Sequence, residues 1–305
     1  MTLTESYVPA DESVPVLETT VGSILQAAAA DSADMLALIE GVDAVDERRT
    51  WTFAELLVDA ERIARALAHR FDKGERVAVW APNIAEWVLL EYACGLAGII
   101  LVTVNPAYQS QELKYVLEQS RSAGLFYLPN FRGNNMSDHL HSVLPELPEI
   151  REVVSFDDLE TWVAATPDGI ELPQVLPSDP VQIQYTSGTT GDPKGVCLTN
   201  GNVYWCGVDC TAAMDFRLGS VWLHSAPMFH LADAVAFWSV PLVGGVQVCV
   251  HFQPDRVLEL IEKERVTITS LPATLIALIA NHSDTSKYDL SSLTQIMYGG
   301  SPTSL

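Results

Sequence analysis

Residues 185–195 read Tyr-Thr-Ser-Gly-Thr-Thr-Gly-Asp-Pro-Lys-Gly, and the interpretation of the whole chain starts from this stretch. It contains three threonines, one serine, three glycines and one lysine. Glycines let a backbone approach a ligand closely, and successive N–H groups of such a backbone form a concave anion site. Hydroxyl groups donate hydrogen bonds to phosphate oxygens, and a lysine adds a positive charge. The stretch therefore has the composition of a loop that binds a polyphosphate.

The position of this loop supports that interpretation. The apolar run 181–184 is predicted to be a strand and a helix is predicted to open near Asn200, so the loop would join a strand to a helix. Proteins of the α/β class bind phosphates at connections of this kind. Two familiar nucleotide motifs do not fit, because Lys194 lies between Pro193 and Gly195 and no GxGxxG is present. Ser/Thr/Gly loops without a ligand are common, but the ordered Pro-Lys-Gly ending argues against chance.

Composition excludes several classes of protein. The 305 residues are 48% hydrophobic and 18% charged, which allows one large or two ordinary domains with a substantial core. Lys and Arg number 17 against 39 Asp and Glu, a net charge of −22 that argues against a nucleic-acid partner and favours solubility. No apolar stretch is long enough for a transmembrane segment. Five cysteines without zinc or CxxC spacing, and no basic secretory leader, favour a cytoplasmic location.

Hydrophobic patterning predicts a regular alternation of strands and helices. Strands are expected at 76–80, 99–104, 124–128, 152–155, 181–186, 221–225, 246–251, 267–270 and 295–298. Helices are expected at 55–69, 84–95, 110–119, 135–143, 156–164, 201–213, 231–240, 254–264 and 272–281. This order predicts an α/β fold of mostly parallel sheets flanked by helices. Residues 1–20 are interpreted as an arm, and the proline-punctuated stretch 166–180 as a linker or subdomain boundary.

The sequence TSGTTGDPKG resembles the phosphate-binding signature of the adenylate-forming (ANL) superfamily, which includes acyl-CoA synthetases, luciferases and the adenylation domains of peptide synthetases. Asn-Pro-Ala-Tyr at 105–108 resembles the NP.Y segment of fatty-acyl-CoA ligases, Pro-Met-Phe-His at 227–230 their P.FH segment, and 298–302 their GG.P segment. The similarity runs from about residue 20 to the last residue. The chain is thus identified as a member of this superfamily, and the resemblance implies two stacked subdomains.

The resemblance also implies a two-step chemistry. A carboxylate attacks the α-phosphorus of Mg·ATP to give an acyl-adenylate and pyrophosphate, and a thiol, usually coenzyme A, then displaces AMP. Prepositioned donors stabilise the negative charge that develops on the leaving pyrophosphate. The residues implied to bind the β- and γ-phosphates are Thr186, Ser187, Thr189, Thr190 and Lys194, with Gly188, Gly191 and Gly195 keeping the loop open. The residues implied to lie near the nucleotide are Gly299, Gly300, Ser301 and Pro302.

The acid substrate is inferred from Phe229 and His230, which the resemblance implies are substrate-binding. Adenylation domains of peptide synthetases carry an Asp where this chain has His230, and that Asp pairs with the α-ammonium of an amino acid. A histidine supplies no fixed anion, so a simple carboxylic acid, such as a fatty acid, is favoured. The apolar segment 231–240 is equally compatible with a packed helix and with a helix that also lines an acyl tunnel. Asp233 is interpreted as a charge on the helix surface, and the histidines show no metal-site spacing.

The sequence departs from the family at its end. Full members continue beyond the equivalent of Leu305 with the Glu that binds Mg²⁺, the Asp that binds the ribose, a hinge and a small domain with a catalytic Lys. Residues 21–305 are therefore expected to be an incomplete AMP-binding domain, either a piece of a longer protein or a truncated product, with no assigned catalytic residue. We expect this chain alone to be a poor catalyst that self-associates through exposed edges and apolar faces.

Three functions remain open from the sequence. The first is an acyl-CoA synthetase for a fatty acid or a related acid. The second is an acyl-AMP ligase that feeds a carrier protein, and the third is a non-catalytic relative that binds nucleotide.

Overall fold

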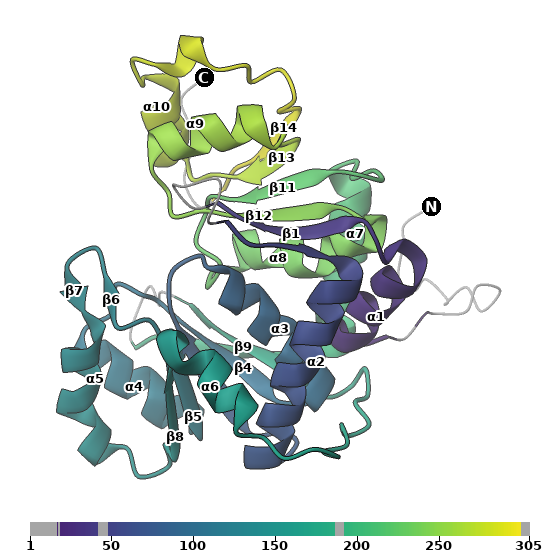
Figure 1. The fold of residues 1–305 in the computed structure, drawn as a ribbon. Coiled ribbons are helices and arrows are strands. Elements are labelled where there is room, and N and C mark those ends of the chain that lie inside the picture. Colours follow the sequence, from purple (N-terminus) through teal and green to yellow (C-terminus); the bar gives the residue numbers. More distant parts are fainter. Residues whose placement is uncertain (1–16, 18, 42–47, 187–191, 300–305) are drawn as a thin grey trace, which may run out of the picture.

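The computed structural model describes residues 17, 19–41, 48–186 and 192–299. In this part of the chain two six-stranded sheets stack with layers of helices (Figure 1). The strands of the first sheet are β1 (Leu36–Glu40), β2 (Thr50–Thr52), β11 (Val221–His224), β12 (Val246–Cys249), β13 (Ile268–Ser270) and β14 (Gln295–Met297). Their spatial order is β14-β13-β11-β12-β1-β2, and all neighbours are parallel except β1 and β2.

The second sheet has the same plan. Its strands are β3 (Arg76–Trp80), β4 (Ile100–Val104), β5 (Gly124–Tyr127), β8 (Glu152–Ser155), β9 (Pro180–Thr186) and β10 (Lys194–Thr199). The order is β10-β9-β4-β3-β5-β8, with β10 antiparallel to β9 and the remaining pairs parallel. A small hairpin of β6 (Asn130–Phe131) and β7 (Asn134–Asn135) follows β5. The prediction of mostly parallel sheets is confirmed.

Helices form three layers around these sheets. The helices between the two sheets are α1 (Val21–Ser32), α2 (Phe53–Arg70), α3 (Ala85–Ala97), α7 (Asn200–Ala213) and α8 (Leu231–Ser239). The outer helices are α4 (Ser110–Ser120) and α5 (Met136–Val143) on the second sheet, and α9 (Pro254–Lys263) and α10 (Ala273–Ala280) on the first. A short helix, α6 (Leu159–Ala164), packs beside α2 and β8.

Alternation along the strands decides which core each side chain enters. In β3, Val77 and Val79 join the central core, while Ala78 and Trp80 join the core under α4 and α5. In β11, Trp222 faces the central core and Leu223 faces α9 and α10. Both sheets are therefore covered on both faces, as parallel sheets require.

Two parts of the predicted element order are corrected. Residues 194–199 form β10, so the stretch 185–195 joins two antiparallel strands and not a strand to a helix. Most of β10 is exposed, and an edge strand of this kind has no buried alternation to indicate it. Residues 21–32 form α1 and residues 36–40 form β1, and neither element was predicted, although Val21, Ile24, Leu25 and Ala28 have helical spacing and are buried in α1. The stretch 166–179 contains no helix or strand and joins α6 to β9.

A buried acid lies in the central layer. Glu91 on α3 is 1% exposed, and its two oxygens accept hydrogen bonds from Trp238 Nε1 at 3.0 Å and Gln182 Nε2 at 2.9 Å. Burial disfavours the ionised form and raises the pKa of Glu91 to about 7, although both hydrogen bonds oppose this shift.

Glu91 should therefore make stability depend on pH. Between about pH 4.5 and 7 the folded protein retains a proton that an unfolded glutamate has released, so the free energy of unfolding falls by about 3 kcal/mol as the pH rises through this window. We expect E91Q to remove this component and to be more stable than the wild type at pH 8, with the difference vanishing near pH 4. Urea unfolding at several pH values measures the effect, with the exposed Glu118→Gln as a control. Parallel curves for E91Q and the wild type would contradict the prediction.

Candidate functional site

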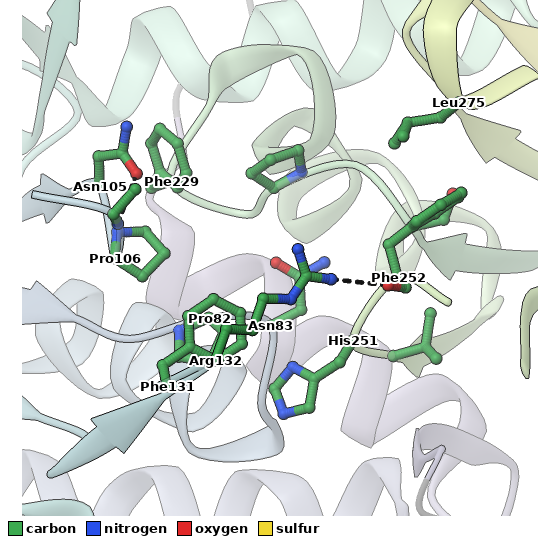
Figure 2. Close-up of a pocket in the computed structure, with 14 residues that line it drawn as sticks. Pro82, Asn83, Asn105, Pro106, Phe131, Arg132, Phe229, His251, Phe252 and Leu275 are labelled. Carbon is green, nitrogen blue, oxygen red and sulfur yellow. Dashed lines mark hydrogen bonds between the residues drawn. The ribbon is translucent and has the colours of Figure 1, made fainter. Parts of the chain in front are cut away.

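A cavity of about 260 Å³ lies where the C-terminal ends of strands from both sheets meet (Figure 2). Its walls come from the segments that follow β3, β4, β11 and β12, from the β6–β7 hairpin after β5, and from α10. The lining residues are Pro82, Asn83, Asn105, Pro106, Ala107, Phe131, Arg132, Ser225, Pro227, Phe229, Val250, His251, Phe252 and Leu275. Open α/β sheets bind their ligands outside the carboxyl ends of the strands, so this cavity is the candidate site.

Two of the segments singled out in the sequence meet in this cavity. Residues 105–107 line one side of the cavity, and Pro227 and Phe229 line another, although more than a hundred positions separate them in the chain. Asn105 shapes its own turn, because its side-chain oxygen accepts from the backbone N–H of Ala107 at 2.9 Å and its carbonyl accepts from Trp80 Nε1 at 3.0 Å. The lining is mostly apolar, as in many pockets for small organic ligands.

Asn83 connects the two sheets at this cavity. It follows β3 of the second sheet, and its Nδ2 donates to the carbonyls of His224 and Ala226 at 2.8 and 2.7 Å. Its Oδ1 accepts from the backbone N–H of Met228 at 2.9 Å. One side chain thus holds the loop that carries Phe229. This role was missed in the sequence, which predicts only that a helix begins at the next residue.

Arg132 closes another side of the cavity. It has a φ of +50° in the turn between β6 and β7, and its Nη2 donates to the carbonyl of Phe252 at 2.7 Å (Figure 2). The neighbouring Phe131 ring lies 5.5 Å from the His251 ring. The guanidinium therefore brings a positive charge to a mostly apolar wall.

Phe229 and His230 are placed differently. Phe229 lines the cavity, whereas His230 is exposed, lies at the N-cap position of α8 and has its ring 5.7 Å from the Phe229 ring. The interpretation of Asp233 as a surface charge was wrong. Asp233 is fully buried, and its Oδ2 lies 2.5 Å from Nδ1 of His224, which is also fully buried. Burial raises the pKa of Asp233, and the interaction with His224 opposes this shift.

The phosphate hairpin, which we define as β9 and β10, lies at the same edge as the cavity. Val102 of β4 pairs in parallel with Ile183 of β9, so Asn105, just after β4, and Thr186, the last residue of β9, lie at the carboxyl ends of neighbouring strands. Thr186 is the partner of Lys194 across the hairpin, and the Lys194 side chain is exposed.

Two contacts hold β10 in place. Tyr115 of α4 donates to the carbonyl of Pro193 at 2.9 Å. Gly195 is required for close packing in the strand, because a Cβ there would lie 2.8 Å from a methyl group of Ile183.

Several of the predicted site residues lie outside the part of the chain that the structure describes. They are Ser187, Gly188, Thr189, Thr190, Gly191, Gly300, Ser301 and Pro302. Gly299 is described and ends this part of the chain just after β14.

Metal-ion clusters and membrane-spanning helices are both absent from the part of the chain that the structure describes. Within residues 17, 19–41, 48–186 and 192–299, no three His, Cys, Asp or Glu side chains gather in a way that could hold a metal ion. No helix in these ranges has the length and apolar character needed to span a membrane.

The fold and site define an AMP-binding domain, and comparison with known proteins agrees. Residues 25–305 match the family described as AMP-binding enzyme, and the chain belongs to that family. It is similar to the medium-chain acyl-CoA ligase ACSF2, mitochondrial, of Mus musculus, with 31% identity over 336 residues that cover 97% of this chain and 53% of that protein. The chain thus spans about half the length of the curated relatives it matches.

Solved structures give the same result for the fold. A long-chain-fatty-acid-CoA ligase (FadD1) from Archaeoglobus fulgidus superposes with a TM-score of 0.86 at 24% identity, covering 98% of this chain and 61% of that one. The o-succinylbenzoate CoA synthetase (MenE) from Bacillus subtilis, in complex with the acyl-adenylate OSB-AMP, superposes with a TM-score of 0.77 at 28% identity. The alignment with MenE covers 94% of this chain and 70% of that one.

The stability of the protein should depend on the chemistry of the side chain at position 83. Asn83→Ala removes three hydrogen bonds and should lower the free energy of unfolding by about 2 kcal/mol. Asn83→Asp should cost more, because it places a carboxylate oxygen against the carbonyls of His224 and Ala226. Thermal and urea unfolding measure both variants, with Asn281→Ala, at the exposed residue that follows α10, as the control. An Asp variant as stable as the wild type would refute this account of the loop.

Proposed function

We propose that this protein activates a carboxylic acid with Mg·ATP, forming an acyl-adenylate, and transfers the acyl group to coenzyme A. The observation that carries the proposal is the convergence of 105–107 and Phe229 in one cavity, at the sheet edge where Thr186 and Lys194 also lie. Membership of the AMP-binding enzyme family supports it. Because the chain spans about half of its curated relatives, the full reaction is proposed for the whole protein.

The phosphate hairpin is the proposed nucleotide site. We assign the β- and γ-phosphates to the side chains of Thr186, Ser187, Thr189, Thr190 and Lys194, with Gly299, Gly300, Ser301 and Pro302 beside the nucleotide. Lys194 fits an anionic ligand, since its ammonium group is exposed at the carboxyl end of β9. Donors held in place before the reaction stabilise the charge that develops on pyrophosphate. Mg²⁺ would neutralise part of the same charge, and we expect its carboxylate ligand beyond the described residues.

A fatty acid is the proposed substrate. The cavity is lined mostly by apolar side chains, including Phe229, which suits an alkyl chain better than a polar side chain. His230 offers no fixed anion for an α-ammonium group, which disfavours amino acids. The names of ACSF2 and FadD1 describe ligases of medium-chain and long-chain acids, and this supports the same class here.

The acceptor and the surroundings of the protein are also proposals. Transfer to a carrier protein, or nucleotide binding without turnover, remains the alternative to transfer to coenzyme A. A cytoplasmic location is supported by five free cysteines. Self-association is supported by the position of β14 at the edge of its sheet, beside the exposed side chains of Ile296 and Tyr298.

Lys194 provides the direct test of nucleotide binding. Lys194→Ala should weaken the binding of Mg·ATP by about tenfold to a hundredfold, because one charge-assisted contact to phosphate is lost. Isothermal titration calorimetry measures the affinity, and Lys263→Ala, at an exposed position on α9, is the matched control. If ATP does not bind, or binds equally well to the Lys194 variant, the hairpin has no nucleotide function.

A panel of acids tests the substrate class. With the complete protein, pyrophosphate release should be fastest with fatty acids, and coenzyme A should be consumed in the second step. The 305-residue chain alone should form thioester far more slowly. An amino acid that gives the fastest pyrophosphate release would refute the argument from His230. A normal rate of thioester formation by the 305-residue chain alone would refute the expectation that this chain is a poor catalyst.

A further inference from the structure

A chain of buried hydrogen bonds crosses the central helical layer from α8 to β9. Trp238 of α8 donates to Glu91 of α3, and Gln182 of β9 donates to the other oxygen of the same carboxylate. Gln184 Nε2 in turn donates to Gln182 Oε1 at 2.9 Å. All four side chains are buried, and the most exposed of them, Gln184, is 7% exposed. These hydrogen bonds therefore connect α8 with β9, the first strand of the phosphate hairpin. Helix α8 follows residues 225–230, the cavity loop, which carries Phe229.

The direction of these hydrogen bonds depends on the proton of Glu91. An ionised carboxylate accepts from both neighbours, which is the arrangement that the structure contains. A protonated carboxyl group has an O–H that needs an acceptor, and the indole of Trp238 can only donate. The proton must therefore face Gln182, whose amide has to turn over to present Oε1. Gln182 then presents Nε2 to Gln184, and the amide of Gln184 has to turn over as well.

Among the described groups around this carboxylate, Glu91 is the one that titrates near neutral pH. Within the described residues, α8 and β9 present the neutral groups of Trp238 and Gln182 to the carboxylate. The titratable groups whose charge interacts with Glu91 are Tyr92 and Cys94, both on α3. Burial raises the pKa of both groups far above neutral, so they stay uncharged while Glu91 titrates with a pKa of about 7.

We propose that Glu91 is a positioning residue for nucleotide binding, because its proton reverses the Gln182–Gln184 amide chain and so alters how β9 presents the phosphate hairpin. The inference rests on the proposed function, since ATP is taken as the ligand of the hairpin. Gln184 lies two residues before Thr186, so the reversal reaches the end of β9 from inside the fold. The ionised carboxylate keeps the hydrogen bonds from Trp238 and Gln182 as the structure has them. ATP should bind more tightly to the protein in this state.

The substitution E91Q imitates the protonated state. A glutamine at position 91 accepts from Trp238 through its oxygen and donates to Gln182 through its nitrogen, which holds the amide chain in the reversed direction at every pH. The ratio of the ATP dissociation constants of E91Q and the wild type should therefore be close to one at pH 5.5. It should rise to about fivefold or more at pH 8.5. Taking the ratio at each pH cancels the ionisation of ATP itself.

Calorimetry of Mg·ATP binding to the 305-residue chain tests this inference, with Glu118→Gln as an exposed control that should follow the wild type. A constant ratio across the pH range, together with normal ATP binding, would overturn the role of Glu91 and leave the proposed function intact. A wild-type chain that binds no ATP at any pH would contradict the proposed function and the coupling to nucleotide together.

A second measurement examines the proton switch without nucleotide. The difference in fluorescence between the wild type and Trp238→Phe reports on the indole beside Glu91. This difference should titrate near pH 7 in the wild-type background and lose that titration in the E91Q background. A difference signal that does not change with pH would overturn the switch, because the indole would then not sense the carboxyl group. A purely structural role for Glu91 would change the stability of E91Q and leave the affinity ratio constant across the pH range.

Discussion

The burial of α3 between two sheets is the constraint on which the rest of the structure depends. Every residue of this helix except Glu86 is buried, so it has no solvent face. A helix that is apolar all round is stable only in an interior, and here the interior is the layer between the sheets. Because β3 leads directly into α3, the loop that carries Asn83 is held at the carboxyl end of the second sheet. The same packing places this side chain within hydrogen-bond distance of the loop that follows β11.

The cavity follows from this arrangement of rigid elements and short loops. Parallel strands end at one edge, and two stacked sheets bring two such edges together. The loops that follow β3, β4, β11 and β12 therefore face one another without long insertions, and Asn83 and Arg132 connect them across the two sheets. Loops on a rigid scaffold are where proteins place binding groups. The proposed acid site and the phosphate hairpin share this edge because β4 and β9 are parallel neighbours.

Local signals predicted much of this fold. Strands such as β3, at 76–80, are short apolar runs, and helices such as α4 carry a hydrophobic period, so their positions were predicted to within a residue or two. The exposed edge strand β10 carries no such period, so the hairpin around Lys194 was mistaken for a strand-to-helix connection. The family resemblance also indicated 105–108 and 227–230, and the structure brings residues of both segments to the cavity wall.

Contacts between distant residues could not be predicted in the same way. Asp233 has a helical position like that of a surface charge, and only the approach of His224 from β11 makes its burial understandable. Asn83 resembles any residue at the start of a helix until the carbonyls of the opposite sheet are placed beside it. A polar side chain in an apolar helix indicates that a partner exists, but it does not identify the partner.

The surroundings of Glu91 show why the members of a buried polar network depend on one another. A leucine at this position would avoid the cost of burying a carboxyl group, but it would leave the N–H groups of Trp238 and Gln182 without acceptors in a site that excludes water. Each member of the chain is thus required by its neighbours, and a single apolar substitution is worse than either a complete polar chain or a complete apolar core. Hydrogen bonds also restrict distance and direction more closely than apolar contacts do. The polar chain therefore fixes the position of α8 relative to β9, and through them the position of the cavity loop relative to the phosphate hairpin.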